Sequence, residues 1–290
     1  MKALSSPGWG TRLAASASAS TLLWISRTLL SLLVAYPLLL ATRESGMVNG
    51  PEGDAVLFRP GSLLLLEFLR VGLPELSAAC KTALLLAGLA LVSELLPLAA
   101  ALDLMWLPGR SFSQRLARAF ALFPRFLGLG GIALLAQAAL LLAASLLSEA
   151  LKPLLRSGDE RVLSLMPIAV LALGLLACSA FGCVLDLARA TLVQRELTAR
   201  EALTHALSCL QKRPFSVLLG AYPSVAGAAL GYLCAAWAMT HLDLSSPSQT
   251  VIAQAFAVHQ LALLFALGFR VRWLRTALEL SNAQPGSSLR

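Results

Sequence analysis

Long apolar runs alternate with short polar segments along this chain of 290 residues. Six of the runs reach the length of about 20 residues that a helix needs to cross a bilayer. Each run is apolar throughout instead of alternating between apolar and polar positions, which favours helices over the strands of a barrel. We therefore predict six membrane spans, at Thr21–Ala41, Thr82–Leu107, Phe126–Ser148, Val162–Leu185, Phe215–Thr240 and Thr250–Phe269.

The overall composition is that of a membrane protein. Hydrophobic residues make up 58% of the chain and charged residues 13%, and a soluble domain of this size could not bury so much apolar surface. The predicted fold class is an all-α polytopic helical membrane bundle of about six transmembrane helices with two cytoplasmic amphipathic helices. The expected domain organisation is a cytoplasmic tail over residues 1–20, a single six-span membrane domain over 21–275 and a flexible cytoplasmic tail over 276–290.

The positions of lysine and arginine predict the orientation of the spans. Of the 23 Lys and Arg residues, fifteen lie at the two termini or in the segments after the second and fourth spans, and seven lie on the opposite side. Cytoplasmic segments carry the excess of Lys and Arg in membrane proteins. We expect a multi-pass protein of a bacterial inner membrane with both termini in the cytoplasm. The formal charge of +8 is then a consequence of orientation, and no nucleic acid partner is expected.

The two long cytoplasmic segments have a similar pattern. Ser111–Gln114 and Thr198–Glu201 both fit the capping box that starts a helix, and both helices are expected to stop at a proline, Pro124 and Pro214. Each helix is amphipathic and could lie in the lipid headgroup layer or pack on the bundle as a connector. In the first arrangement the cations would contact anionic lipids, and the candidates are Arg115, Arg118, Arg200, Lys212 and Arg213.

Side-chain spacing predicts which face of each amphipathic helix is apolar. In the first helix Phe112, Leu116, Phe120 and Phe123 share a face, with Arg115 and Arg118 opposite. In the second helix Ala199, Leu203, Leu207 and Leu210 share a face, with Glu201, Thr204 and His205 opposite.

Short motifs in the second half of the chain carry a resemblance to known proteins. Asp186-Leu187-Ala188-Arg189, then Arg200-Glu201-Ala202-Leu203, then Lys212-Arg213-Pro214 resemble a segment that recurs in bacterial multi-pass membrane proteins without an assigned activity. The segment is also similar to the membrane domain attached to some glycerophosphodiester phosphodiesterases. The resemblance implies a six-span helical domain with amphipathic connectors. It implies no catalytic residues, because the phosphodiesterase chemistry belongs to a separate soluble domain.

Charged side chains inside a span are the first candidates for function. Glu94 lies near the middle of the second span and could relay protons or bind a cation, or could be a structural, hydrogen-bonded acid. Arg27 and Asp103 lie at similar expected depths, which predicts a structural ion pair between the first two spans. Alternatively, Arg27 could extend to the cytoplasmic headgroups.

Other candidate sites have a structural explanation that we favour. Asp186 and Arg189 are three residues apart and predict a local salt bridge rather than a metal site. Glu201, His205 and Cys209 repeat every four residues and could bind a metal, but a solvated polar face is the preferred interpretation. The glycines of the Gly227–Gly231 motif predict close helix packing.

The functional expectation is correspondingly general. The sequence carries no recognisable nucleophile, metal or phosphate-binding motif, and we expect a protein that is not an enzyme and needs no cofactor. The first hypothesis is a scaffold or lipid-interacting component whose partners are membrane lipids and other membrane proteins. The alternative is a small transporter or channel subunit that uses the intramembrane carboxylate of Glu94.

Overall fold

The computed structural model describes residues 9–44, 64–155, 160–195, 197–242 and 249–282. Within these ranges the chain is helical and contains no strand, which confirms the all-α class. The helices are α1 (Trp9–Glu44), α2 (Leu64–Ser93), α3 (Leu95–Trp106), α4 (Phe112–Leu155), α5 (Glu160–Arg195), α6 (Ala199–Lys212), α7 (Pro214–Met239) and α8 (Gln249–Asn282).

Six helical stretches are long and apolar enough to cross a membrane, and they match the six runs of the sequence. The helices are longer than the predicted spans at both ends of the chain. α1 begins at Trp9, within the segment expected to be a tail, and α8 continues to Asn282, beyond the expected domain end at residue 275. The last turns of α8 are helical because Ala277, Leu278 and Ser281 are buried against the bundle.

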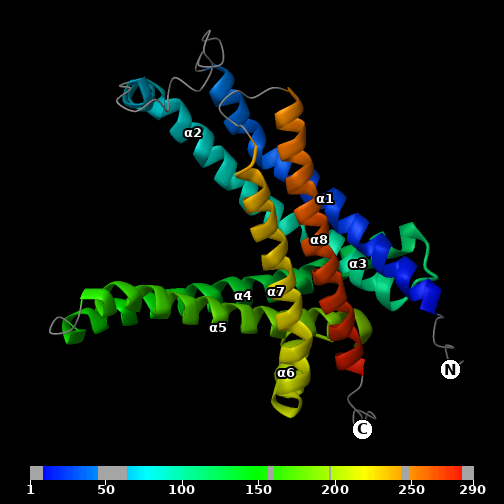
Figure 1. Ribbon diagram of the computed structural model, residues 1–290. Coiled ribbons are helices and arrows are strands. Elements are labelled where there is room, and N and C mark those ends of the chain that lie inside the picture. Colours follow the sequence, from blue (N-terminus) through cyan, green and yellow to red (C-terminus); the bar gives the residue numbers. More distant parts are fainter. Residues whose placement is uncertain (1–8, 45–63, 156–159, 196, 243–248, 283–290) are drawn as a thin grey trace, which may run out of the picture.

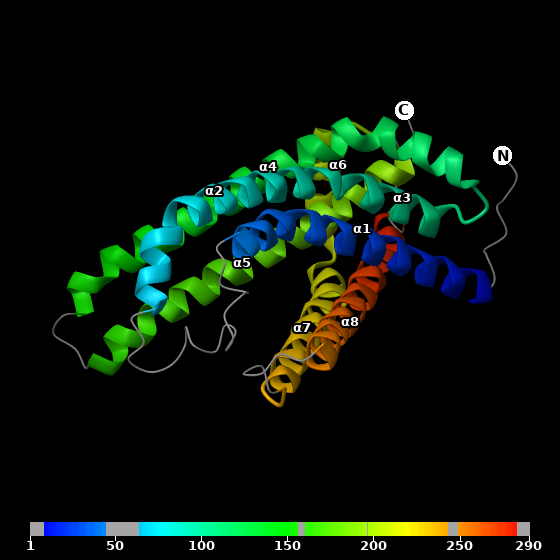
Figure 2. The ribbon, with the colours of Figure 1, turned by 90° about the horizontal axis from the view of Figure 1, so that it is seen from above.

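Three helical hairpins diverge from a common region, as Figures 1 and 2 show. α1 pairs with α2, α4 with α5, and α7 with α8. The tip of the α4–α5 hairpin lies far from the tips of the other two in Figure 1, whereas the described ends of the chain lie near the common region. The two pockets described below are each lined by residues of two hairpins.

The common region, which we call the base, contains most of the buried core. Its fully buried large side chains include Leu102 of α3, Phe126 of α4, Leu187 of α5 and Leu274 of α8. α6 also belongs to it, because Ala202, Ala206 and Cys209 are buried in the same cluster. The base is thus an interior of ordinary protein packing that holds together the inner ends of all three hairpins.

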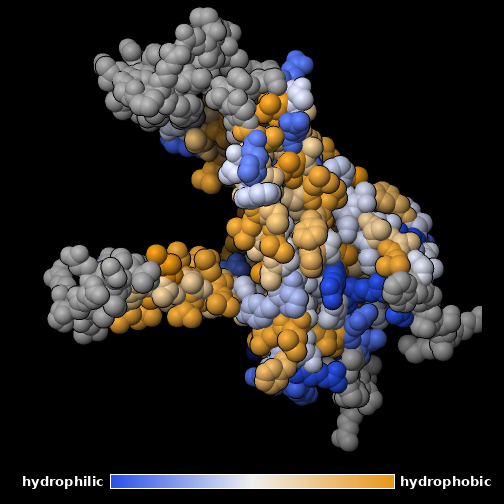
Figure 3. All heavy atoms as spheres, viewed as in Figure 1, coloured by the Kyte–Doolittle hydropathy of each residue, from blue (hydrophilic) through white to orange (hydrophobic). Residues whose placement is uncertain are grey.

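The outer parts of the hairpins expose apolar side chains. Leu135 of α4 is 75% exposed and Leu173 of α5 is 67% exposed. Figure 3 shows hydrophobic side chains over the α4–α5 hairpin and along the face formed by α7 and α8, with hydrophilic ones gathered near the base. In a bilayer these exposed side chains would contact acyl chains, so no further protein layer is needed to cover them.

The second span has a one-residue break in its middle, across which the backbone stays helical, since the Glu94 N–H donates to Ala90 and the Glu94 carbonyl accepts from Leu98. α2 ends at Ser93 and α3 begins at Leu95, so Glu94 lies at the junction between them. Pro97 explains the break, because it cannot donate to the carbonyl of Ser93 and its ring crowds that carbonyl. The break leaves a backbone carbonyl unpaired within the helix beside an acidic side chain.

The prediction that the first amphipathic helix stops at Pro124 is wrong. α4 runs without interruption through Pro124 for 44 residues, a length of about 66 Å at 1.5 Å per residue. Leu122 and Phe126, on either side of the proline, are both buried in the base, and this packing keeps the helix continuous. The second helix behaves as predicted, because α6 ends at Lys212 and Pro214 takes the first position of α7.

The predicted close packing at Gly227 and Gly231 is confirmed. A Cβ at Gly227 would lie 2.5 Å from the ring of Phe269, and one at Gly231 would lie 2.6 Å from the ring of Phe265. Both rings belong to α8, so the two glycines allow α7 and α8 to approach closely. These two helices form one tightly packed unit.

Candidate functional site

An ion pair joins two spans in the middle of the bundle. Nε of Arg27, on α1, donates a hydrogen bond to Oε1 of Glu94, at the junction of α2 and α3. Both residues lie near the middle of their candidate spans, Gly10–Ala41 and Ser77–Trp106. Glu94 therefore has a charged partner at its own depth, which the sequence did not indicate.

This pair replaces the predicted ion pair between Arg27 and Asp103, which is wrong. The prediction placed the start of the first span at Thr21, so Arg27 seemed to lie close to the cytoplasmic edge. Because α1 begins at Trp9, Arg27 lies in the middle of a longer helix and is level with Glu94.

A pocket of about 590 Å³ opens beside the pair. Its walls come from α1, α2, α7 and α8, and most of its lining is aliphatic. The polar groups in it are Arg27, Ser31, Glu94, Tyr232 and His259. We call this the charged pocket. Its volume lies within the range of small-ligand sites, and an apolar lining with a few polar groups is typical of them.

The two charges of this pocket are accessible. The side chain of Arg27 is 36% exposed and that of Glu94 is 24% exposed. Within the described part of the chain, the structure shows one hydrogen bond for this pair, between Nε and Oε1. The Nη groups of Arg27 and Oε2 of Glu94 are therefore left for another partner.

A polar contact close to the pair joins α1 to α8. Oε1 of Gln260 accepts a hydrogen bond from the Trp24 indole at 2.8 Å and from the Thr28 hydroxyl at 3.2 Å. Gln260 follows His259 in the sequence, so this contact fixes the wall of the pocket that carries His259. Sequence patterns had not singled out Gln260, because a glutamine in an apolar helix shows its partner only in the folded structure.

Asp103 pairs with two arginines of the following segment. Its fully buried carboxylate lies 2.8 Å from Nη1 of Arg110 and 3.2 Å from Nε of Arg118. Arg118 also donates to the backbone carbonyl of Val193 on α5, at 2.8 Å. These contacts lie in the base, away from the charged pocket, and they connect α3, α4 and α5.

A second carboxylate, Asp186 of α5, is held by several donors at once. Nη2 of Arg270 donates to Oδ1 at 2.7 Å, and the indole of Trp273 donates to Oδ2 at 2.9 Å. The predicted salt bridge to Arg189 is confirmed, with Nη1 of Arg189 3.2 Å from Oδ1. Asp186 is fully buried, so this cluster connects α5 to α8 with the carboxylate saturated by donors.

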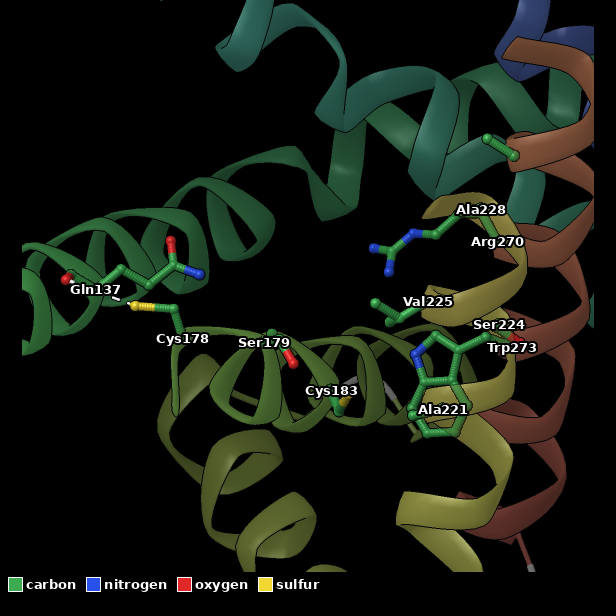
Figure 4. Close-up of a pocket in the computed structure, with 12 residues that line it drawn as sticks. Gln137, Cys178, Ser179, Cys183, Ala221, Ser224, Val225, Ala228, Arg270 and Trp273 are labelled. Carbon is green, nitrogen blue, oxygen red and sulfur yellow. Dashed lines mark hydrogen bonds between the residues drawn. The ribbon is translucent and has the colours of Figure 1, made fainter. Parts of the chain in front are cut away.

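A smaller cavity of about 370 Å³ lies next to this cluster, between the α4–α5 hairpin and α7–α8. Figure 4 shows Arg270 and Trp273 on one side of it and Ser179 and Cys183 of α5 on the other. The Cys178 thiol points to the backbone carbonyl of Gln137, at 3.9 Å. The charged group that borders this cavity, Arg270, is already bound to Asp186.

The capping boxes predicted for the two amphipathic helices are both present. In α6 the backbone N–H of Glu201 donates to the Thr198 hydroxyl at 3.3 Å, and the Thr198 N–H donates to the Glu201 carboxylate at 2.9 Å. The hydrogen bonds that the backbone N–H and the hydroxyl of Thr198 donate to this carboxylate lower the pKa of Glu201. Ser111 and Gln114 make the same reciprocal contacts at 3.4 and 3.2 Å.

The polar stripe of α6 is only partly solvated. Glu201 is exposed, but Cys209 is buried in the base, so the prediction of a solvated face is wrong for Cys209. His205 is half-buried, and its pKa is lowered by burial and by the charges of Arg195 and Lys212. Among the described residues, no group of three or more His, Cys, Asp and Glu side chains could hold a metal ion.

The candidate lipid contacts divide into two groups. Arg200, Lys212 and Arg213 are exposed around α6. Arg115 and Arg118 are turned inward, since Arg115 donates to the carbonyl of Pro108 and Arg118 contacts Asp103 and Val193.

Three of the four residues on the apolar face predicted for the first amphipathic helix, Phe112, Leu116 and Phe120, are exposed, and the fourth, Phe123, packs against the core. Phe112 is 69% exposed and Phe120 is 55% exposed, whereas Ala119 is buried. This segment therefore buries Ala119 and Leu122 against the bundle and directs Phe112 and Phe120 outward. α6 packs on the bundle through Ala202 and Ala206.

Comparisons with known proteins do not extend this description. No protein-family model matches the chain, and neither curated proteins nor solved structures give a significant match. The structure itself defines the class: a multi-pass, all-α membrane protein with an ion pair exposed to a pocket between its spans.

Proposed function

We propose that this chain is a non-enzymatic, lipid-binding protein of a bacterial inner membrane, with both termini in the cytoplasm. Its binding site is the charged pocket, and the ligand is an amphiphile whose polar part reaches Arg27 and Glu94. The observation that carries the proposal is an accessible ion pair inside an apolar pocket of about 590 Å³. Charged side chains inside a span are rare, and an ion pair there that also borders a pocket is a candidate functional site by default.

Two further features support a lipid as the ligand. The pocket lies between hairpins whose outer parts expose leucines, so acyl chains would surround its opening. In addition, Arg200, Lys212 and Arg213 form an exposed cationic surface around α6, which fits contact with anionic headgroups on the cytoplasmic side. The resemblance to membrane domains of phosphodiesterases stays a prediction and is not required.

A second candidate is a small transporter, and the break in the second span favours it. Discontinuous spans surround the substrate sites of many transporters, and Glu94 lies at a one-residue break next to Ser93, whose carbonyl lacks the helical donor that Pro97 cannot supply. This candidate predicts flux of a solute or ion across liposomes that depends on Glu94. Lipid binding alone predicts no such flux.

Blocking the pocket tests the proposal. Ala87 lines the pocket, and replacing it with tryptophan should fill much of the space. The matched control is Leu84→Trp, because Leu84 is on the same helix, 75% exposed and outside the pocket lining. Native mass spectrometry of protein purified in mild detergent should show retained phospholipid for the natural chain and for Leu84→Trp, and several-fold less for Ala87→Trp. Equal retention in all three would refute the proposal.

A further inference from the structure

We infer that the charged pocket selects a zwitterionic headgroup that carries a phosphate and a primary ammonium, as phosphatidylethanolamine does. This inference rests on the proposed function and adds the chemical class of the ligand. The phosphate would bind Arg27 and the ammonium would bind Glu94. Three observations lead to it: the unused atoms of the ion pair, the charge balance of the pocket and the form of its lining.

The first observation is the way in which the two side chains meet. Their hydrogen bond uses one of the five N–H groups of Arg27 and one carboxylate oxygen of Glu94. The two Nη groups form a planar pair of donors that suits a phosphate, and the free Oε2 is an acceptor that suits an ammonium. A ligand with both charges can therefore bind without breaking the existing pair.

The second observation concerns net charge. The guanidinium of Arg27 and the carboxylate of Glu94 compensate each other, so this pair gives the pocket no net charge. An anionic or cationic ligand would leave one uncompensated charge in a pocket whose lining is mostly aliphatic, which is costly. A zwitterion adds none, and each of its charges meets the opposite charge of the protein.

The third observation is the distribution of polar and apolar lining. Arg27 and Glu94 are accompanied by Leu30, Val34, Leu38, Leu91 and Leu263, which line the pocket with aliphatic surface. Tyr232, which is 44% exposed, and His259 supply polar groups on the α7–α8 side. A headgroup at the ion pair with its glycerol and first chain carbons against the leucines matches this arrangement.

The test compares two lipids with identical acyl chains. Delipidated protein is mixed with equal amounts of phosphatidylethanolamine and phosphatidylglycerol, and the retained lipids are counted by native mass spectrometry. The natural chain should prefer phosphatidylethanolamine by about tenfold, the effect expected of one charge-assisted hydrogen bond. Glu94→Gln removes the ammonium partner and leaves Arg27 unbalanced, so the preference should reverse. Glu94→Asp keeps the carboxylate and should keep the preference.

A competition with chain-free glycerophosphoethanolamine separates a lipid from a small solute. If the site takes the lipid, this compound should not displace it at similar concentration; displacement would assign the same chemistry to a soluble zwitterion. Equal retention of the two lipids by the natural chain would overturn the inference, whatever the stability of the variants. If Ala87→Trp still abolishes retention in that case, the proposed function stands and only the headgroup class is wrong.

Discussion

Two carboxylates of the bundle, Glu94 and Asp186, have different environments although each faces an arginine on another helix. Asp186 is fully buried and receives hydrogen bonds from Arg270, Trp273 and Arg189. Glu94 is a quarter exposed and shares one hydrogen bond with Arg27 beside a pocket. A saturated carboxylate stabilises the junction of helices, whereas one with an unused oxygen next to an accessible cation can bind a ligand. The number of hydrogen bonds that each carboxylate receives, more than its charge, separates the structural site from the candidate functional site.

The largest expected effect is the loss of stability in Asp186→Asn. The change leaves the cations of Arg270 and Arg189 without their counter-charge in the interior, which costs about 3–5 kcal/mol. Glu94→Gln should cost about 1 kcal/mol, because its pair is partly exposed. Thermal or denaturant unfolding in detergent, followed by tryptophan fluorescence, measures both. Comparable losses for the two variants would break the distinction between the sites.

A smaller loss of stability is expected from overpacking between α7 and α8, the two helices that line both the charged pocket and the cavity next to Asp186. Gly227→Ala would place a methyl group 2.5 Å from the Phe269 ring, and such overpacking costs about 1–3 kcal/mol. Gly268→Ala is the matched control, since no atom lies within 4 Å of its Cβ position. The same unfolding assay should show a lower midpoint for Gly227→Ala alone. A loss of headgroup preference in this variant would show that the wall also shapes the pocket.

The smallest expected effect is the pH dependence that His205 gives to the stability of the protein, which is separate from the effects of Glu94 and Asp186. Burial lowers the pKa of His205 below its ordinary value of 6.5, so the unfolded chain binds the proton more readily than the folded chain. The stability from neutral His205 is present above pH 6.5 and is lost as the pH falls through the lowered value. The unfolding midpoint of His205→Gln should therefore change less between pH 7 and pH 5 than that of the natural chain. An unchanged slope would assign the acid sensitivity to other groups.

The spans and the second amphipathic helix could be predicted because they depend on local signals. Run length, the capping box at Thr198 and the proline at 214 each act within a few residues, and all three appear in the structure. The salt bridge between Asp186 and Arg189 is local in the same sense. By contrast, Arg270 and Trp273 are 84 and 87 residues from Asp186, and no periodicity connects them.

The candidate site was missed for a physical reason that begins at the first helix. Residues 9–20 are rich in alanine and serine and have no strong apolar run, but Ala15 and Ala19 are buried and extend α1 by three turns. This extension changes the depth of Arg27 and therefore its partner. The inward turn of Arg118 had a similar cause, since a buried acid, Asp103, outweighs the preference of a guanidinium for water or headgroups.

The continuity of α8 has a mechanical consequence. His259 lines the charged pocket, and Gln260 is the next residue of the helix. Arg270 and Trp273 donate hydrogen bonds to Asp186 about three turns further along α8. Neither a proline nor a break separates these two parts of the helix. A helix transmits axial sliding and rotation almost undiminished over such a distance. Any displacement of α8 that admits or releases a molecule at the charged pocket would therefore strain the hydrogen bonds that Arg270 and Trp273 donate to Asp186. These hydrogen bonds limit how far the helix can move.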